Sequence, residues 1–262
     1  MYTIQNYVKV KTLEEAYTLN QKKTSKIIGG GMWIRLGKRN IGTAIDLSGL
    51  GLDKIEETEE EFIIGCMTSL RDIECHERLN NYFHGMMKEV MKGIVGTQFR
   101  NTATIGGSIY QRFGFSDPLT ALLALDTTVE LYQAGSVSLD DFVSMPYDND
   151  LLVRIRIKKD GKKAAYQSFR NTKTDFPVLA VAVSQKDSVW KIAVGARPMR
   201  AKAVSKVWEL KELPNPEELE AFAANISDAF TYQSNMRASG EYRKLLAGVL
   251  IERAVQSILT EK

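Results

Sequence analysis

Two glycine-rich segments contain the residues whose types and spacing could do chemistry. The first runs Gly29-Gly30-Gly31-Met32-Trp33 after a short apolar stretch, and the second runs Thr104-Ile105-Gly106-Gly107-Ser108. Glycine adopts positive φ and lets a ligand approach the main chain closely. Successive N–H groups in such a turn form a concave site for anions, including diphosphates. Each segment is therefore a candidate anion site. A tight turn that needs positive φ without any ligand remains the alternative for either segment.

Neither segment matches the common nucleotide-binding motifs. The dinucleotide fingerprint needs G-x-G-x-x-G between a strand and a helix, and a P-loop ends in Gly-Lys-Ser/Thr. Both patterns are absent from the two segments. The sequence therefore disfavours a Rossmann fold and a nucleoside-triphosphate site.

The cysteines and histidines do not predict a metal. Cys66 and Cys75 are the two cysteines of the chain, whereas an all-cysteine iron–sulfur cluster takes four thiolates. His76 and His84 lie close to Cys75, but their spacing matches no zinc pattern. We therefore expect no metal on this chain, and no residue stands out as a nucleophile or as an acid–base pair.

Composition and charge exclude several classes of protein. The 262 residues carry a net charge of +3 and show no concentrated basic stripe, so we expect no nucleic-acid partner. No apolar run approaches the ~20 residues of a membrane helix. The first residues lack the pattern of a signal peptide. We therefore expect a cytoplasmic protein.

The elements that must position the two segments can be predicted from periodicity and capping. Thr12 and Glu15 have capping-box spacing, so we expect a helix there as the first element. Asp117 before Pro118 predicts the N-cap of another helix. In the first half we further expect strands at 26–28, 43–47, 128–132 and 151–157, a hairpin at 53–65, and helices starting near 68–69 and spanning 85–95.

The second half follows a polar turn at 160–163, which is the candidate domain boundary. We expect strands near 164–170, 178–184 and 189–195, then helices near 200–210, 216–228 and 239–260. Strands followed by helices in each half indicate an α+β protein.

The two glycine segments resemble motifs of one known family. Residues Lys26 to Trp33 resemble the "(K)-hydrophobic-A-G-G-T-D-L" FAD loop of flavoprotein subunits in the xanthine dehydrogenase and carbon monoxide dehydrogenase family. Residues Gln98 to Ile109 look like that family's "Q-I-R-N-x-x-T-I-G-G-N-I", and Asp117 to Leu125 are similar to "D-x-x-P-A-L-L-A-L-D". Residues 237–250 resemble its closing "R-A-S-x-E-Y-R-x-x-L-A-x-x-L" helix. The resemblance thus spans nearly the whole chain.

The resemblance implies a fold and a division into domains. Residues 1–159 would form an FAD-binding domain of the vanillyl-alcohol-oxidase (PCMH) type, in two lobes of about 1–52 and 53–159. Residues 160–262 would form a smaller C-terminal sheet-and-helix domain of the carbon monoxide dehydrogenase flavoprotein type.

The resemblance also implies a role in a molybdenum hydroxylase complex. This chain would bind FAD, and partner subunits would hold iron–sulfur clusters and molybdopterin. Electrons would pass from the clusters through FAD to NAD or another acceptor. A flavin suits that position because it accepts single electrons and donates two as a hydride.

Carried over residue by residue, the resemblance implies that the first loop wraps the FAD diphosphate and its neighbouring sugar. The second segment would line the same region from the other lobe, Asp117 would bind a ribityl or ribose hydroxyl, and Gln167 stands where a lysine is frequent near the flavin. An N-cap that needs no ligand is the alternative for Asp117. The cofactor-binding candidates are Lys26, Ile27, Ile28, Gly29, Gly30, Gly31, Met32, Trp33, Ile34, Thr104, Ile105, Gly106, Gly107, Ser108, Asp117 and Gln167.

Some residues depart from the family pattern. Met32-Trp33 replaces Thr-Asp, Ser108 replaces the usual Asn, and residues 110–116 replace a small, polar "A-N-A-S-P-A-G". The aromatic residues there either contact the flavin or pack in the core, which is the commoner place for Phe and Tyr. Two other functions remain open: a stand-alone flavin-dependent reductase or oxidase of the same fold, and a flavin-less assembly scaffold.

Overall fold

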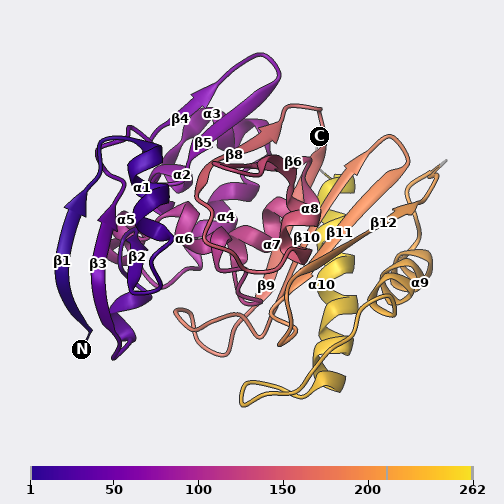
Figure 1. The fold of residues 1–262 in the computed structure, drawn as a ribbon. Coiled ribbons are helices and arrows are strands. Elements are labelled where there is room, and N and C mark those ends of the chain that lie inside the picture. Colours follow the sequence, from indigo (N-terminus) through magenta and orange to yellow (C-terminus); the bar gives the residue numbers. More distant parts are fainter. Residues whose placement is uncertain (1, 211, 261–262) are drawn as a thin grey trace.

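The computed structural model describes residues 2–210 and 212–260, which form three β-sheets with helices between and beside them. In Figure 1 the sheets follow one another from the N-terminal sheet on the left to the C-terminal sheet on the right. Strands and helices do not alternate regularly along the chain, as expected for an α+β protein. None of the helices in these two ranges is both long and apolar enough to cross a membrane.

The N-terminal sheet has three parallel strands in the order β1-β3-β2. Its elements are β1 (Thr3–Lys9), α1 (Leu13–Asn20), β2 (Ser25–Ile28), the 3-10 helix η1 (Ile34–Leu36) and β3 (Asn40–Asp46). The Thr12 hydroxyl caps α1 as predicted, accepting the N–H of Glu15 at 3.1 Å. The prediction that a helix is the first element was wrong, because β1 precedes it. β1 is an edge strand whose residues are mostly exposed, so it carries no apolar pattern to reveal it.

The central sheet has five antiparallel strands in the order β4-β5-β8-β6-β7. Its strands are β4 (Ile55–Glu57), β5 (Glu61–Gly65), β6 (Thr127–Leu131), β7 (Gly135–Ser138) and β8 (Leu152–Lys158). The helices that accompany it are α2 (Leu70–Cys75), α3 (Glu77–Tyr82), α4 (Met86–Lys92), α5 (Thr97–Thr102), α6 (Ile105–Tyr110), α7 (Asp117–Ala124) and α8 (Leu139–Ser144). β4 and β5 form the predicted hairpin.

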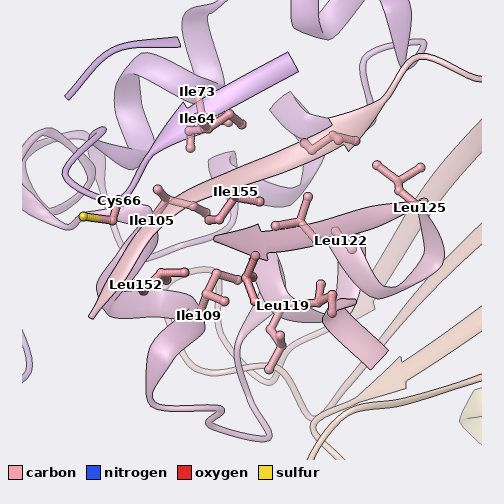
Figure 2. Close-up of a cluster of buried hydrophobic side chains, with 14 of the residues drawn as sticks. Ile64, Cys66, Ile73, Ile105, Ile109, Leu119, Leu122, Leu125, Leu152 and Ile155 are labelled. Atoms are coloured by element: carbon pink, nitrogen blue, oxygen red, sulfur yellow. The ribbon is translucent and has the colours of Figure 1, made fainter. Parts of the chain in front are cut away.

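The main core lies between this sheet and helices α2, α6 and α7. Figure 2 shows Ile64 of β5 and Ile155 of β8 in one buried cluster with Ile105 of α6 and Leu122 of α7. All four side chains are fully buried. Since α6 carries the second glycine segment, this apolar contact fixes that segment against the sheet.

The C-terminal sheet has four antiparallel strands in the order β12-β11-β10-β9. Its elements are β9 (Lys163–Phe169), β10 (Leu179–Lys186), β11 (Val189–Gly195), β12 (Lys202–Val207), α9 (Pro216–Ser227) and α10 (Gly240–Thr260). Helix α7 packs against one face of this sheet, and α9 and α10 cover the other face, as Figure 1 shows for α10. The predicted helix near 200–210 was wrong, because that segment pairs with β11 as the edge strand β12.

Candidate functional site

The first glycine segment follows directly from strand β2. Lys26 is exposed on that strand, and Ile27 and Ile28 are partly buried. The chain then turns through Gly31, which has a φ of +66°. It continues into the 3-10 helix that begins at Ile34. Positive φ at Gly31 is a conformation that side-chain-bearing residues rarely adopt, so the turn itself explains this glycine.

The structure brings the two glycine segments together. A Cβ placed on Gly29 would lie 2.6 Å from the Thr104 hydroxyl oxygen, and one on Gly30 would lie 1.7 Å from the Thr102 carbonyl oxygen. Both distances are far below van der Waals contact. The loop after β2 of the N-terminal sheet thus packs directly on the chain that enters α6, a helix of the central layer. This close approach requires glycine at positions 29 and 30 independently of any ligand.

The second segment forms the start of helix α6, where Thr104 is the N-cap. Four of its five N–H groups donate within the chain: Ile105 to the Thr68 carbonyl at 2.9 Å, Gly106 to the Cys66 carbonyl at 2.8 Å, Gly107 to the Thr104 hydroxyl at 3.3 Å, and Ser108 to the Thr104 carbonyl at 3.2 Å. A Cβ on Gly106 would lie 2.6 Å from the Cys66 carbonyl oxygen. Gly106 is therefore required by packing, and substituting it would disturb the fold.

The N–H groups of the first segment differ from those of the second. Residues 29–33 donate none of the main-chain hydrogen bonds found in the described part of the chain outside its helices and strands. Consecutive unpaired N–H groups around a residue with positive φ are the donors that an anion would use. The first segment, and not the second, therefore has the donor set that fits the diphosphate of a dinucleotide.

Asp117 is buried and bound by protein groups. Its carboxylate accepts hydrogen bonds from the Tyr166 hydroxyl and from the Arg170 guanidinium, the latter at 2.6 Å. Burial raises the pKa of Asp117, and the Arg170 and Tyr166 contacts oppose that rise. Ser116, and not Asp117 as predicted, is the N-cap of α7, since its hydroxyl accepts the N–H of Leu119. Asp117 thus joins α7 to the first strand of the C-terminal sheet.

Gln167 lies on the other face of strand β9 from Tyr166, because successive residues of a strand point to opposite faces. Tyr166 packs against the main core on the α7 side, whereas neighbouring Ala165 belongs to the core formed with α9 and α10. Both Tyr166 and Gln167 line a cavity of about 410 Å³ at the edge strand β9, together with Met86 and Lys92. The structure therefore brings Asp117 and the Tyr166 hydroxyl together and places Gln167 on a different face.

Trp33 is the centre of an aromatic cluster that the sequence did not predict as a unit. Its ring centre lies 5.1 Å from that of Phe113, 5.3 Å from that of Phe115 and 5.8 Å from that of Phe176. The rings of Phe113 and Phe115 stack with an interplanar angle of 10°. Trp33 is still 46% exposed. The cluster joins the first glycine loop, the segment after α6 and the C-terminal half of the chain at one position.

The cysteine and histidine residues that could act as a nucleophile or as metal ligands have structural roles instead. Burial raises the pKa of the Cys66 thiol to about 12, so it is not an activated thiolate. His76 caps helix α3, since its Nδ1 accepts the N–H of Leu79 at 3.1 Å. Within residues 2–210 and 212–260, no group of three His, Cys, Asp or Glu side chains could hold a metal ion.

Two protein families match the chain. Residues 2–158 match the FAD binding domain in molybdopterin dehydrogenase, and residues 164–258 match the CO dehydrogenase flavoprotein C-terminal domain. These two ranges together cover nearly the whole chain.

Individual proteins also resemble the chain over almost its full length. It is 24% identical to the uncharacterized protein YgfM of Escherichia coli K12, covering 95% of this chain and 94% of that one. It is 26% identical to the glyceraldehyde dehydrogenase medium chain of Sulfolobus acidocaldarius, covering 97% and 98%. The solved carbon monoxide dehydrogenase of Hydrogenophaga pseudoflava superposes with a TM-score of 0.82 at 21% identity, covering 97% and 96%. The predicted fold is thereby confirmed.

Proposed function

Because this chain belongs to the family of FAD-binding medium subunits of molybdenum hydroxylases, we propose that it passes electrons from a partner's iron–sulfur clusters through FAD to an acceptor. The relatives are named as medium chains or subunits of dehydrogenases and hydroxylases, including nicotine 6-hydroxylase and carbon monoxide dehydrogenase. We infer from these names that this chain also works with an iron–sulfur subunit and a molybdopterin subunit. NAD or another small molecule is the proposed final acceptor.

The glycine loop after β2 is the proposed binding site for the FAD diphosphate. The observation that carries this assignment is the set of main-chain N–H groups at residues 29–33, which donate to no main-chain carbonyl in the described chain. Thr104 lies against Gly29 and closes one side of the loop. Because the N–H groups of residues 105–108 are already used, the second segment supports the loop by packing and supplies no further main-chain donors.

The remaining candidates are assigned by their positions. Lys26 to Ile28 form the strand that leads into the loop, and Met32 packs on the main core and anchors its far end. Trp33 and its aromatic neighbours offer flat apolar surface beside the loop. When bound, FAD supplies the ability to take electrons singly and deliver them as a pair. The chain would hold the cofactor and exclude water from it. We place the boundary between the FAD-binding and C-terminal domains near residue 160, in the turn between β8 and β9.

A matched pair of glycine substitutions tests the loop assignment. Gly31 has a φ of +66° and Gly51 has a φ of +65°, and an added Cβ would meet nothing closer than 4.0 Å at either position. Replacing either glycine with alanine should therefore cost similar stability, about 1 kcal/mol, through the same backbone strain. Only Gly31→Ala also displaces the N–H groups of the proposed diphosphate site.

The measurement is FAD content, read from the visible spectrum and from chromatography of the released cofactor. The wild-type chain and Gly51→Ala should hold close to one FAD per chain, whereas Gly31→Ala should bind FAD at least about tenfold more weakly. Equal FAD affinity in both variants would contradict the loop assignment. A folded wild-type chain that stays colourless even after excess FAD is added would favour the flavin-less scaffold. Steady turnover of a small donor by the isolated chain would favour a stand-alone flavin enzyme.

A further inference from the structure

Arg112, which lies outside the proposed FAD site, has an unfavourable backbone conformation and an unfavourably buried charge. It follows helix α6 with a φ of +48°, which is rare for a residue with a side chain. Its side chain is almost completely buried, with 1% of its surface exposed. Residues held in such strained conformations cluster at functional sites. The combination therefore points to a role beyond the path of the main chain.

The guanidinium of Arg112 is only partly satisfied by the protein. Its Nε donates to the Phe142 carbonyl at 2.8 Å, and its central carbon lies 3.9 Å from the centre of the Phe142 ring. The buried Nη1 and Nη2 atoms have no hydrogen-bond partner among the described residues. Stacking on Phe142 stabilises one face of the guanidinium, but it gives the N–H groups of Nη1 and Nη2 no acceptor. Buried polar atoms without partners are rare in folded proteins and call for an acceptor.

A second arginine lies at the same place. The centre of the Tyr147 ring is 5.0 Å from the guanidinium carbon of Arg112 and 5.0 Å from that of Arg200. Arg200 donates to the Val143 carbonyl at 2.6 Å. Burial, and then the charge of Arg200, lower the pKa of Arg112. In the part of the chain that the structure describes, neither arginine forms an ion pair with a carboxylate, although the more distant charge of Asp148 acts on Arg112.

The Tyr147 ring lies beside both guanidinium groups at the protein surface. Its side chain is 57% exposed. Its hydroxyl donates to the Gln111 carbonyl at 2.6 Å, which is the hydrogen bond that holds the ring in place. The segment 145–151 that carries it forms neither helix nor strand.

We propose that Arg112 and Arg200 form a binding site for a phosphoryl group, which the Tyr147 ring closes in the ligand-free chain. Guanidinium groups offer forked N–H donors that match the oxygens of a phosphoryl group. Two of them at one position suit a ligand with two negative charges better than a single carboxylate. The site is formed by residues outside the glycine loop and stands independently of the proposed FAD site.

Calorimetric titration of the full-length chain with inorganic pyrophosphate tests this site. Tyr147→Ala should strengthen pyrophosphate binding because the cover is lost, whereas Arg112→Gln in that background should weaken it at least about tenfold. Arg39→Gln removes the same charge at an exposed position and should leave the affinity unchanged. If Arg112→Gln fails to fold, Arg200→Gln provides the same comparison. Absence of pyrophosphate binding to Tyr147→Ala, or equal binding by the arginine variants, would overturn the proposal.

Repeating the titration on FAD-saturated protein shows which phosphorylated ligand the site binds. Pyrophosphate binding that persists on FAD-saturated protein would assign the site to a second phosphorylated ligand. Binding that depends on Arg112 and that FAD abolishes would place the FAD diphosphate on the two arginines. Both of these results support a phosphoryl site, whereas binding that FAD abolishes but that does not depend on Arg112 belongs to the glycine loop and would overturn the proposal. The titration does not need bound FAD. Failure of the glycine-loop assignment would therefore leave this result unaffected.

Discussion

Removing one partner of the buried contact between Asp117 and Arg170 should destabilise the junction of α7 and β9, because it leaves the other partner buried without it. The carboxylate accepts a hydrogen bond from the Arg170 guanidinium at 2.6 Å and another from the Tyr166 hydroxyl. The exposed fractions are 10% for the Arg170 side chain and 6% for the Asp117 side chain, so solvent screens the pair little. Asp117→Asn keeps the size of the side chain and removes its charge. It would leave the buried Arg170 guanidinium without its ion-pair partner.

The expected cost is about 3–5 kcal/mol in the free energy of unfolding, which is typical when one partner of a buried ion pair is removed. A domain of ordinary stability has only ~5–15 kcal/mol in total, so the variant should be folded but clearly weakened. Arg170→Met alone should also be costly. In the double variant the second change should cost less than it does alone, because no unpaired charge remains, and the coupling should be about 0.5–3 kcal/mol.

Urea denaturation followed by circular dichroism measures these differences in the FAD-free chain. The control is Asp140→Asn, which removes the ion pair with Lys191 at the surface, where Asp140 is 50% exposed. That control should cost less than about 1 kcal/mol. If Asp117→Asn also costs less than about 1 kcal/mol but loses FAD, the reasoning is refuted. Asp117 would then serve mainly as a ligand of the ribityl or ribose hydroxyl, as the family resemblance implies.

Two further predictions concern the aromatic cluster and the acid stability of the central sheet. Trp33→Ala should weaken FAD binding about three- to tenfold through lost stacking while leaving ADP binding unchanged, whereas Leu36→Ala, at an exposed apolar position nearby, should change neither. Equal effects on FAD and ADP would place Trp33 away from the flavin ring. Hydrogen bonds from Arg78 and Lys159 lower the pKa of Glu57 to about 2. A carboxyl whose pKa is depressed by folding stabilises the protein above its unfolded value near 4.5, and that contribution is lost as the pH falls towards 2. Stability curves of wild type and Glu57→Gln, measured by urea denaturation from pH 6 to 2, should converge in that window, and a constant difference would contradict this assignment.

Several features of the fold could be predicted from local sequence because local physics decides them. The hydroxyl of Thr12 caps α1, and alternation along β8 buries Ile155 while Arg156 faces outward. The helices α9 and α10 were likewise expected from their apolar spacing. Edge strands β1 and β12 were missed because their residues are mostly exposed. Pairing with a neighbouring strand decides such segments, and a single sequence does not display the neighbour.

For the candidate site, the sequence by itself determined the two glycine motifs, the family and thus the cofactor class. It could not determine why each glycine is there. Tertiary packing shows that Gly30 and Gly106 are required by backbone contacts with Thr102 and Cys66, whereas Gly31 is required by its positive φ. Only the fold decides that the N–H groups of Ile105 and Gly106 are already used, because their acceptors, Thr68 and Cys66, are distant in sequence. The same holds for Asp117, whose partners lie about 50 residues away in β9 and the segment after it.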